Sequence, residues 1–296
     1  MGSLFGALLA ESGAEVWLVD IWQEHVDRIN ADGLSVESDS RQRQVLLNAT
    51  VDPKEVAGAQ LVIVFVKSTH TEAAAPTAGG MVATEGSILT LQNGMGNAET
   101  LARTNAPDRI VVGTTSHGAT LLGPGQIRHA GRGPTVIGPW ANGGTGIQRT
   151  KQIATVLTSA SINTEVESDV LPVLWGKLIV NVGINAITAL TGIMNGQILD
   201  LDGTKELSRA AVEEALAVAH AQQIPIRDDA VTHVFEVARA TAANRSSMGQ
   251  DVDKRRITEI GAINGYIVRE AQRLEVDVPV NQTLTTLIRT LECHYP

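Results

Sequence analysis

Three polar side chains interrupt one long apolar run at steps of four residues. The run extends from Trp175 to Ile187, and the three side chains are Lys177, Asn181 and Asn185. At about 100° per residue they fall within an arc of roughly 80° on a helix that is otherwise apolar. A buried lysine is costly unless it is paired, and its pKa shifts readily toward neutrality, which suits proton transfer. The pattern predicts a proton donor and two amide groups on one face of a core helix.

These three residues by themselves are also compatible with a purely structural role. A lysine near a helix end can extend its ammonium group to water, and two asparagines can serve as polar contacts inside a core. The rest of the sequence is needed to distinguish the catalytic interpretation from the structural one.

Composition limits the class of protein. The chain has 296 residues with 43% hydrophobic content, which is enough for two cores. It contains no apolar run of transmembrane length and no signal peptide pattern. A single cysteine, Cys293, excludes an internal disulfide and a multi-cysteine metal site, and a net charge of −9 disfavours nucleic acids and anionic membranes as partners. We therefore expect a soluble cytoplasmic protein without a metal.

The first half of the chain alternates β-branched runs with helical segments, and the second half is helical throughout. Four runs are typical of buried parallel strands: Ala14–Val19, Leu61–Val66, Ser87–Leu91 and Ile110–Gly113. Helical periodicity predicts helices near 170–190, 204–221, 227–242, 255–274 and 281–293. The sequence thus predicts a doubly wound α/β domain of the Rossmann type over residues 1–166 and an all-helical substrate and catalytic domain over residues 167–296.

Two helix starts carry local signals. Asp202, Gly203 and Thr204 offer cap and loop residues with Glu206 in the first turn, and Asp228 and Asp229 follow Pro225.

The chain opens with a helical segment, Gly2–Gly13, that no strand precedes. In a dinucleotide-binding domain this helix follows a strand and a G-x-G-x-x-G turn, and Gly2 and Gly6 are the only glycines near that turn. Asp20 ends the next strand 18 residues after Gly2, where an acid binds the adenosine ribose, although an acid there also commonly caps a loop. We expect either a first strand upstream of residue 1 or a damaged copy with two unpaired strand edges.

Together these features resemble one known family, the ketopantoate reductases (2-dehydropantoate 2-reductases). The segments that carry the resemblance are Gly2–Gly6, Val66–Lys67, Leu91–Gly96, Gly123–Gly125, Trp175–Lys177 with Asn181 and Asn185, Ser246–Met248 with Gln250 and Asp251, and Thr258–Ile260 with Asn264 and Gly265. The resemblance implies an NADPH-dependent reduction of a 2-keto acid, the ketopantoate-to-pantoate step of pantothenate synthesis.

The resemblance also implies roles for individual residues. Lys177 would be the general acid, and Glu259 would orient the substrate. The substrate contacts it implies are Asn93, Asn181, Asn185 and Ser247, and the cofactor contacts that we expect are Gly2, Ser3, Asp20, Lys67 and Asn93. The expected partner is a small 2-keto acid, and a homodimer is an open alternative to a single chain.

The chemistry also follows from the residue types. Hydride addition to a ketone leaves negative charge on the oxygen, so a cationic donor about 3 Å away stabilises the transition state and then supplies the proton. Lys177 fits this role, and Glu259 could keep the lysine charged or accept a substrate hydroxyl. The alternative for Glu259 is membership of a solvated charge run, and Asn93 alone is typical of a turn after a strand.

Several choices remain open. Asp20 would repel a 2′-phosphate, so the chain could prefer NADH where the family uses NADPH. The substrate could be another 2-keto acid, and a non-catalytic scaffold that has lost cofactor binding is a further alternative. His117 and His129 lack a carboxylate at ligand spacing and are interpreted as ordinary surface or core residues, and Trp175 as a packing residue.

Overall fold

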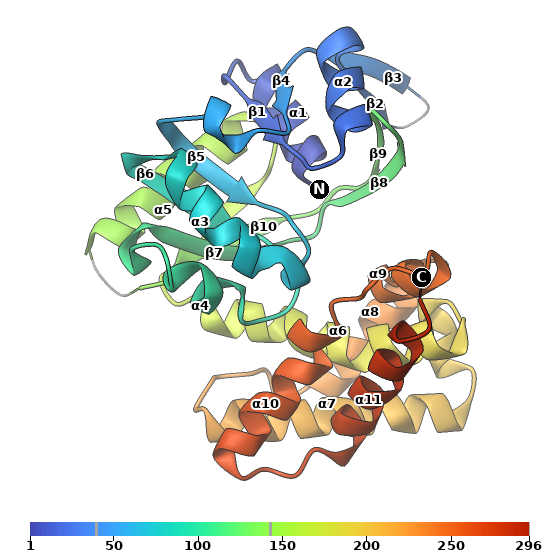
Figure 1. Ribbon diagram of the computed structural model, residues 1–296. Helices are drawn as coiled ribbons and strands as arrows, with labels where there is room; N and C mark the ends of the chain where they lie inside the picture. Colours follow the sequence, from blue (N-terminus) through green and yellow to red (C-terminus); the bar gives the residue numbers. More distant parts are fainter. Residues whose placement is uncertain (39–40, 142–143, 296) are drawn as a thin grey trace. The chain divides into compact units, whose positions relative to one another are not determined.

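The computed structural model describes residues 1–38, 41–141 and 144–295 (Figure 1). Its contacts divide the chain into two compact units. The first unit comprises Met1–Val66, His70–Gln92 and Ala98–Val170. The second unit comprises Leu171–Pro296 together with two short segments, Lys67–Thr69 and Asn93–Asn97. Each short segment follows a strand of the first unit, β5 or β6, so the chain leaves that sheet twice to contribute residues to the second unit.

The main sheet of the first unit has five strands in the order β11-β10-β7-β6-β5. Its strands are β5 (Ala59–Val64), β6 (Val82–Thr90), β7 (Ile110–Thr115), β10 (Thr135–Pro139) and β11 (Thr164–Val166). β5, β6 and β7 are parallel, as the sequence predicted, whereas β10 runs antiparallel to β7. Figure 1 shows α3 (Thr71–Met81) in front of this sheet and α5 (Gly144–Ser159) behind it. The predicted doubly wound α/β class is confirmed.

The first predicted strand lies in a separate two-stranded sheet. β1 (Trp17–Val19) pairs in parallel with β4 (Asn48–Thr50), and within the described ranges it has no ladder to β5. The strand is shorter than the predicted Ala14–Val19.

A third sheet, with the order β3-β2-β9-β8, was not predicted. Its strands are β2 (Leu34–Ser38), β3 (Arg41–Val45), β8 (Gly118–Gly123) and β9 (Gln126–Gly131). β3 has the sequence RQRQV, so it lacks the apolar alternation that marks a half-buried strand. Pairing with β2 stabilises β3 as a strand, and a single sequence does not encode that pairing locally.

The remaining helices of the first unit begin with α1 (Gly2–Glu11), which the sequence predicted. Leu4 and Phe5 of α1 are fully buried in the core of this unit. A Cβ atom at Gly6 would lie 2.7 Å from Leu18 Cδ2, so the glycine permits close packing of α1 on β1. The other helical segments of this unit are α2 (Gln23–Asp32), α4 (Asn97–Ala102) from Ala98 onward, and the short 3₁₀ turns η1 (Pro53–Glu55) and η3 (Pro107–Arg109). The 3₁₀ turn η2 (Ser68–His70) has its first two residues in the second unit.

The second unit is all-helical in its described part from Leu171 onward, as predicted. Its elements are α6 (Leu171–Thr191), η4 (Asn195–Leu199), α7 (Asp202–Ala221), α8 (Ala230–Ala240), α9 (Ser247–Asp253), η5 (Ile260–Ala262), α10 (Asn264–Leu274) and α11 (Pro279–Glu292). α6 packs against α7, α8, α9 and α11. By length and composition α6 could cross a membrane, but 61% of its most apolar window is buried inside the protein, which is typical of a core helix.

The predicted helix at 255–274 is wrong in its first part. α9 ends at Asp253, Arg255 takes a positive φ of 49°, and α10 begins only at Asn264. The left-handed backbone at Arg255 ends the helical periodicity, and the non-helical stretch that follows carries Thr258 and Glu259. The predicted cap at Asp202 is also wrong, since that residue is already the first residue of α7.

Candidate active site

Lys177 lies on α6 among buried apolar neighbours. Leu178 and Ile179 beside it are 1% and 2% exposed. Burial lowers the pKa of the Lys177 ammonium group to about 8, and the Glu259 carboxylate opposes this shift by raising it. Trp175 is 1% exposed and contacts the Tyr266 ring edge-on, so its predicted role as a packing residue fits its place. The Lys177 ammonium group therefore has a pKa well below the ordinary lysine value and interacts electrostatically with the Glu259 carboxylate.

Glu259 is held by two segments that are distant in the sequence. Its Oε1 accepts a hydrogen bond from the backbone N–H of Ser68 at 2.9 Å, and its Oε2 accepts one from Asn93 Nδ2 at 3.3 Å. These residues are 191 and 166 positions away from Glu259. The carboxylate thus has a fixed orientation, and each of its two oxygens accepts one hydrogen bond.

The backbone around Glu259 is fixed as well. The Thr258 N–H donates to the Glu292 carboxylate at 2.7 Å, and the Ile260 N–H donates to Thr258 Oγ1 at 3.1 Å. Thr258 is buried, so its polar groups need these partners. Glu259 lies on this fixed backbone and is not part of a solvated charge run.

The loop that carries Asn93 depends on a glycine. Gly94 has a φ of +76°, and a Cβ atom there would collide with the Ala262 carbonyl group. The neighbouring Met95 N–H donates to that same carbonyl at 2.8 Å, and Asn97 Nδ2 donates to the Asn93 carbonyl at 3.1 Å. Close approach of the loop to η5 is what places the Asn93 amide beside Glu259.

Lys67 is engaged within the second unit. Its ammonium group forms an ion pair with Asp251 of α9, and Nζ lies 3.5 Å from the Ile257 carbonyl oxygen. The pair holds segment Lys67–Thr69, from which the Ser68 N–H reaches Glu259. In the sequence, Asp251 stands out only within a motif and Ser68 has no predicted role, because a backbone donor leaves no sequence signal.

The other predicted substrate contacts lie on α6 and α9. Asn181 is partly buried, Asn185 is 5% exposed, and Ser247 is an exposed first residue of α9. The hydrogen bonds described for Glu259 reach Asn93 but not these three residues. The structure therefore brings Lys177, Glu259 and Asn93 together, and places the remaining three on the two packed helices α6 and α9.

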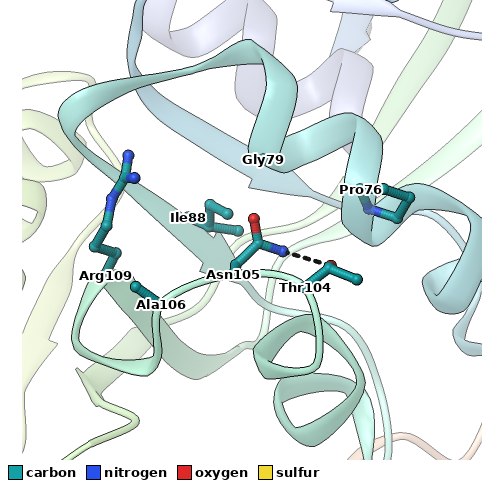
Figure 2. Close-up of a pocket in the computed structure, with 7 residues that line it drawn as sticks. All are labelled: Pro76, Gly79, Ile88, Thr104, Asn105, Ala106 and Arg109. Atoms are coloured by element: carbon teal, nitrogen blue, oxygen red, sulfur yellow. Dashed lines mark hydrogen bonds between the residues drawn. The ribbon is translucent and has the colours of Figure 1, made fainter.

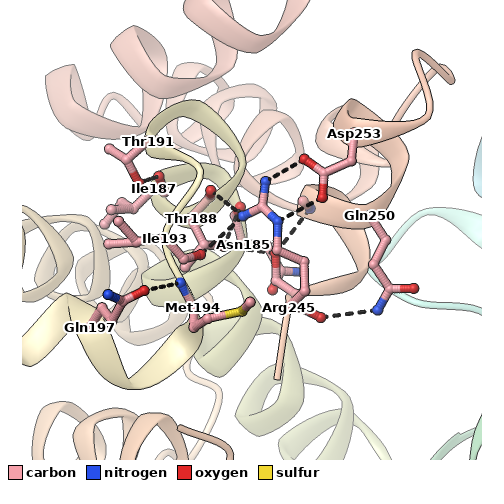
Figure 3. Close-up of polar contacts among 12 residues, drawn as sticks. Asn185, Ile187, Thr188, Thr191, Ile193, Met194, Gln197, Arg245, Gln250 and Asp253 are labelled. Atoms are coloured by element: carbon pink, nitrogen blue, oxygen red, sulfur yellow. Dashed lines mark hydrogen bonds and ion pairs between the residues drawn. The ribbon is translucent and has the colours of Figure 1, made fainter. Parts of the chain in front are cut away.

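The start of α9 is anchored on the end of α6 (Figure 3). Arg245 pairs with Asp253 at 2.8 Å and donates to the Ile193 carbonyl at 3.0 Å and to the Thr188 carbonyl. Ser246 Oγ accepts from the Gly249 N–H at 3.0 Å, which caps α9. These contacts hold Ser247 in place relative to the end of α6 near Asn185.

The predicted cofactor residues of the first unit lie at two adjacent turns. Gly2 and Ser3 form the first turn of α1, where no side chain caps the helix. Asp20 follows β1, is exposed, and accepts a hydrogen bond on Oδ1 from the Trp22 N–H at 3.0 Å. An uncapped helix start with a hydroxyl and an exposed carboxylate at a strand end suit a pyrophosphate and a ribose diol, so these residues fit a dinucleotide.

A cavity of about 280 Å³ occupies another part of the first unit (Figure 2). It is lined by Pro76, Gly79, Ile88, Thr104, Asn105, Ala106 and Arg109. Ile88 is paired with Ile110, the first residue of β7, so the cavity lies at the amino end of that strand. Ligands of open α/β sheets bind at the carboxyl ends, and none of the predicted site residues lines this cavity.

Fold and site define a class of protein: a Rossmann-type dinucleotide-binding domain joined to a helical domain that carries a lysine with a lowered pKa. Comparison with known families agrees. The family model described as ketopantoate reductase PanE/ApbA matches residues 1–142, and the model of its C-terminal domain matches residues 169–292. The chain belongs to the ketopantoate reductase family, whose members are oxidoreductases that use NAD(P)H.

Individual relatives cover nearly the whole chain. The 2-dehydropantoate 2-reductase of Halobacterium salinarum is 38% identical over 98% of this chain and 95% of its own length. A PanE/ApbA family ketopantoate reductase from Ralstonia eutropha has a TM-score of 0.89 with 34% identity, covering 98% of this chain and 94% of that structure. D-Mandelate dehydrogenase bound to NADH and anilino(oxo)acetate has a TM-score of 0.93 with 26% identity, covering 99% of this chain and 96% of that structure.

Proposed function

We propose that this chain reduces 2-dehydropantoate to pantoate with NAD(P)H, as a cytoplasmic enzyme of pantothenate synthesis. The observation that carries the proposal is the partly buried Lys177, whose pKa is lowered to about 8 and which interacts with the Glu259 carboxylate. We assign cofactor binding to residues 1–166, and substrate binding and proton donation to residues 167–296. The 2-dehydropantoate 2-reductase relatives, which match almost the full length, support the substrate.

In the proposed mechanism, a side chain of the protein carries out one proton transfer. A reduced nicotinamide cofactor, which Gly2, Ser3 and Asp20 would hold, would supply the hydride for the ketone carbon of the substrate. The Lys177 ammonium group donates a hydrogen bond to the ketone oxygen and stabilises the negative charge that develops there. An O–H bond then forms as an N–H bond of Lys177 breaks, which gives the 2-hydroxy acid and a neutral amine that regains a proton from water. Glu259 favours the ammonium form and so keeps Lys177 able to donate.

The amides and the hydroxyl of the site are proposed to recognise the substrate. Asn93, Asn181, Asn185 and Ser247 supply neutral donors and acceptors for a carboxylate and hydroxyl groups. Lys67, held by Asp251, is the further cation we assign to the cofactor and substrate region.

For the cofactor, we propose that Gly2 and Ser3 contact the pyrophosphate and Asp20 the adenosine ribose. An exposed carboxylate at the end of β1 accepts hydrogen bonds from the ribose diol and repels a 2′-phosphate, so we expect NADH to be used at least as well as NADPH. The NADH in the related D-mandelate dehydrogenase structures supports this preference.

A second candidate is the reduction of a different 2-keto acid. The observation that favours it is the TM-score of 0.93 with D-mandelate dehydrogenase, higher than that with the Ralstonia eutropha ketopantoate reductase. Pocket shape selects the substituent on the keto acid, and a few contacts are enough to change this selection.

A substrate panel tests the proposal. The purified protein is assayed with NADH and with NADPH on 2-dehydropantoate, 2-oxo-2-phenylacetate and pyruvate. We expect the highest kcat/KM on 2-dehydropantoate. A preference for the phenyl compound would support the second candidate, and absence of both turnover and cofactor binding would support a non-catalytic scaffold.

A further inference from the structure

His25 of α2 is a buried titratable residue that the proposed mechanism does not use. It is 3% exposed, and its Nδ1 accepts a hydrogen bond of 2.9 Å from the backbone N–H of Gly125. A backbone N–H can only donate, so Nδ1 carries no proton. Burial lowers the pKa of His25, with Asp20 acting in the opposite direction, and this favours the neutral ring. The single proton of the imidazole therefore lies on Nε2.

This tautomer fixes the hydroxyl group of Ser3. His25 Nε2 lies 3.2 Å from Ser3 Oγ. Because Nε2 carries the proton, it donates and Ser3 Oγ accepts. The hydroxyl hydrogen of Ser3 is then available to a different acceptor, at the first turn of α1 where no side chain caps the helix. Ser3 is thereby prepared as a donor.

The turn that orients His25 is rigidly held. Gly125 has a φ of +68°, and a Cβ atom there would lie 2.8 Å from the Arg28 Cβ. Its carbonyl accepts from the Ser35 N–H at 2.8 Å. This explains the Gly123-Pro124-Gly125 segment, to which sequence reasoning gave no role: its last glycine lets the turn approach α2 closely enough to donate to His25.

The imidazole also lies beside the Asp20 turn. Trp22 stacks on His25 with ring centroids 5.6 Å apart and an interplanar angle of 9°, and the Trp22 N–H donates to Asp20 Oδ1. One buried ring thus contacts Ser3 directly and, through Trp22, the turn that carries Asp20.

We propose that His25 is a positioning residue for the dinucleotide: it holds the Ser3 hydroxyl as a hydrogen-bond donor to the cofactor pyrophosphate. The inference rests on the proposed function, in which Ser3 contacts the cofactor. Because the Ser3 oxygen already accepts a hydrogen bond from His25, the hydroxyl does not have to reorient to donate to a phosphate oxygen. The hydrogen bond to the phosphate is charge-assisted.

Two amide substitutions separate this role from a purely structural one. In His25→Gln the amide nitrogen replaces Nε2 and keeps the donor to Ser3, whereas in His25→Asn the amide oxygen replaces Nδ1 and keeps only the acceptor for Gly125. We expect the Kd for NADH, measured by calorimetry, to stay within about threefold in His25→Gln and to rise about tenfold in His25→Asn. The reverse order, with the asparagine variant rescued and the glutamine variant impaired, would show a structural clamp and overturn the inference.

A double-mutant cycle with Ser3 completes the test. Ser3→Ala is expected to weaken NADH binding about tenfold, and His25→Asn to add little to it, because both changes remove the same donor. Ser12→Ala, at the other end of α1, is the matched control and should leave the Kd unchanged. Additive losses, or wild-type affinity in Ser3→Ala, would contradict the inference.

The inference and the proposed function fail in different ways. Wild-type turnover of 2-dehydropantoate with wild-type affinity in Ser3→Ala would overturn the cofactor roles of His25 and Ser3 but not the proposed reaction. The expected pattern of NADH affinities without turnover of 2-dehydropantoate would overturn only the proposed substrate.

Discussion

The two predicted sites of the chain are built in opposite ways. In the second unit, Glu259 is held by residues 191 and 166 positions away, and the lowered pKa of Lys177 arises mainly from burial. In the first unit, Ser3, Asp20 and His25 lie within 23 residues of one another on two adjacent helices and one strand end. The chemical site thus depends on contacts between distant segments throughout, whereas the residues of the cofactor site come from one stretch of the chain and only His25 is oriented from a distance, by the Gly125 N–H. Changes in the chemical site should affect kcat, and changes in the cofactor site should affect affinity.

The largest effect is expected at Lys177. Lys177→Ala should lower kcat by a factor on the order of 10²–10⁴ with nearly unchanged NADH affinity, because it removes only the proton donor. Steady-state kinetics on 2-dehydropantoate and calorimetry with NADH measure the two quantities. Lys151→Ala, an exposed lysine of α5, is the control. Wild-type turnover in Lys177→Ala would show that Lys177 is not the proton donor of the chemical site.

Glu259→Gln should have the next largest effect. It keeps the shape of the side chain but removes the charge that raises the pKa of Lys177, so kcat at pH 7.5 should fall roughly 10- to 100-fold. Glu236→Gln on the exposed face of α8 provides a matched control. An unchanged kcat would mean that Glu259 acts only as a structural acceptor for Ser68 and Asn93.

Gly94→Ala tests the dependence of the chemical site on packing. The φ of +76° and the collision with the Ala262 carbonyl should lower the free energy of unfolding by about 2 kcal/mol, or about 30-fold in the equilibrium constant. Urea denaturation measures this loss. Gly203→Ala has no neighbour within 4 Å of the added Cβ and lies in α7, so it should be neutral or slightly stabilising. Equal stability of the two variants would contradict the account of this loop.

The smallest expected effect concerns Asp20. Asp20→Ala should raise the ratio of kcat/KM with NADPH to that with NADH by about tenfold, since the repulsion of a 2′-phosphate is removed. Asp27→Ala, exposed on α2, should leave the ratio unchanged. A strong NADPH preference in the unmutated protein would show that Asp20 does not bind the ribose.

The fold class and the charged residues of the sites could be predicted from the sequence, but the groups that contact those residues could not. The α6 stripe was visible because burial of a lysine breaks a simple periodicity, and β5, β6 and β7 because buried parallel strands are apolar throughout. The Ser68 N–H, the Asp251 partner of Lys67 and the buried His25 were invisible, since each depends on a contact between segments far apart in the sequence. β3 was missed for the same reason, because its residues are polar and its pairing with β2 makes it a strand.

The pH dependence of kcat tests the central claim most directly. If Lys177 with a pKa of about 8 is the general acid, the protonated form is active, so kcat on 2-dehydropantoate at saturating NADH should be constant below that pKa and fall above it. In Glu259→Gln the fall should move to lower pH, because the charge that raises the pKa of Lys177 is gone. A kcat that stays flat from pH 6 to about 10, near the ordinary lysine pKa, would contradict the account.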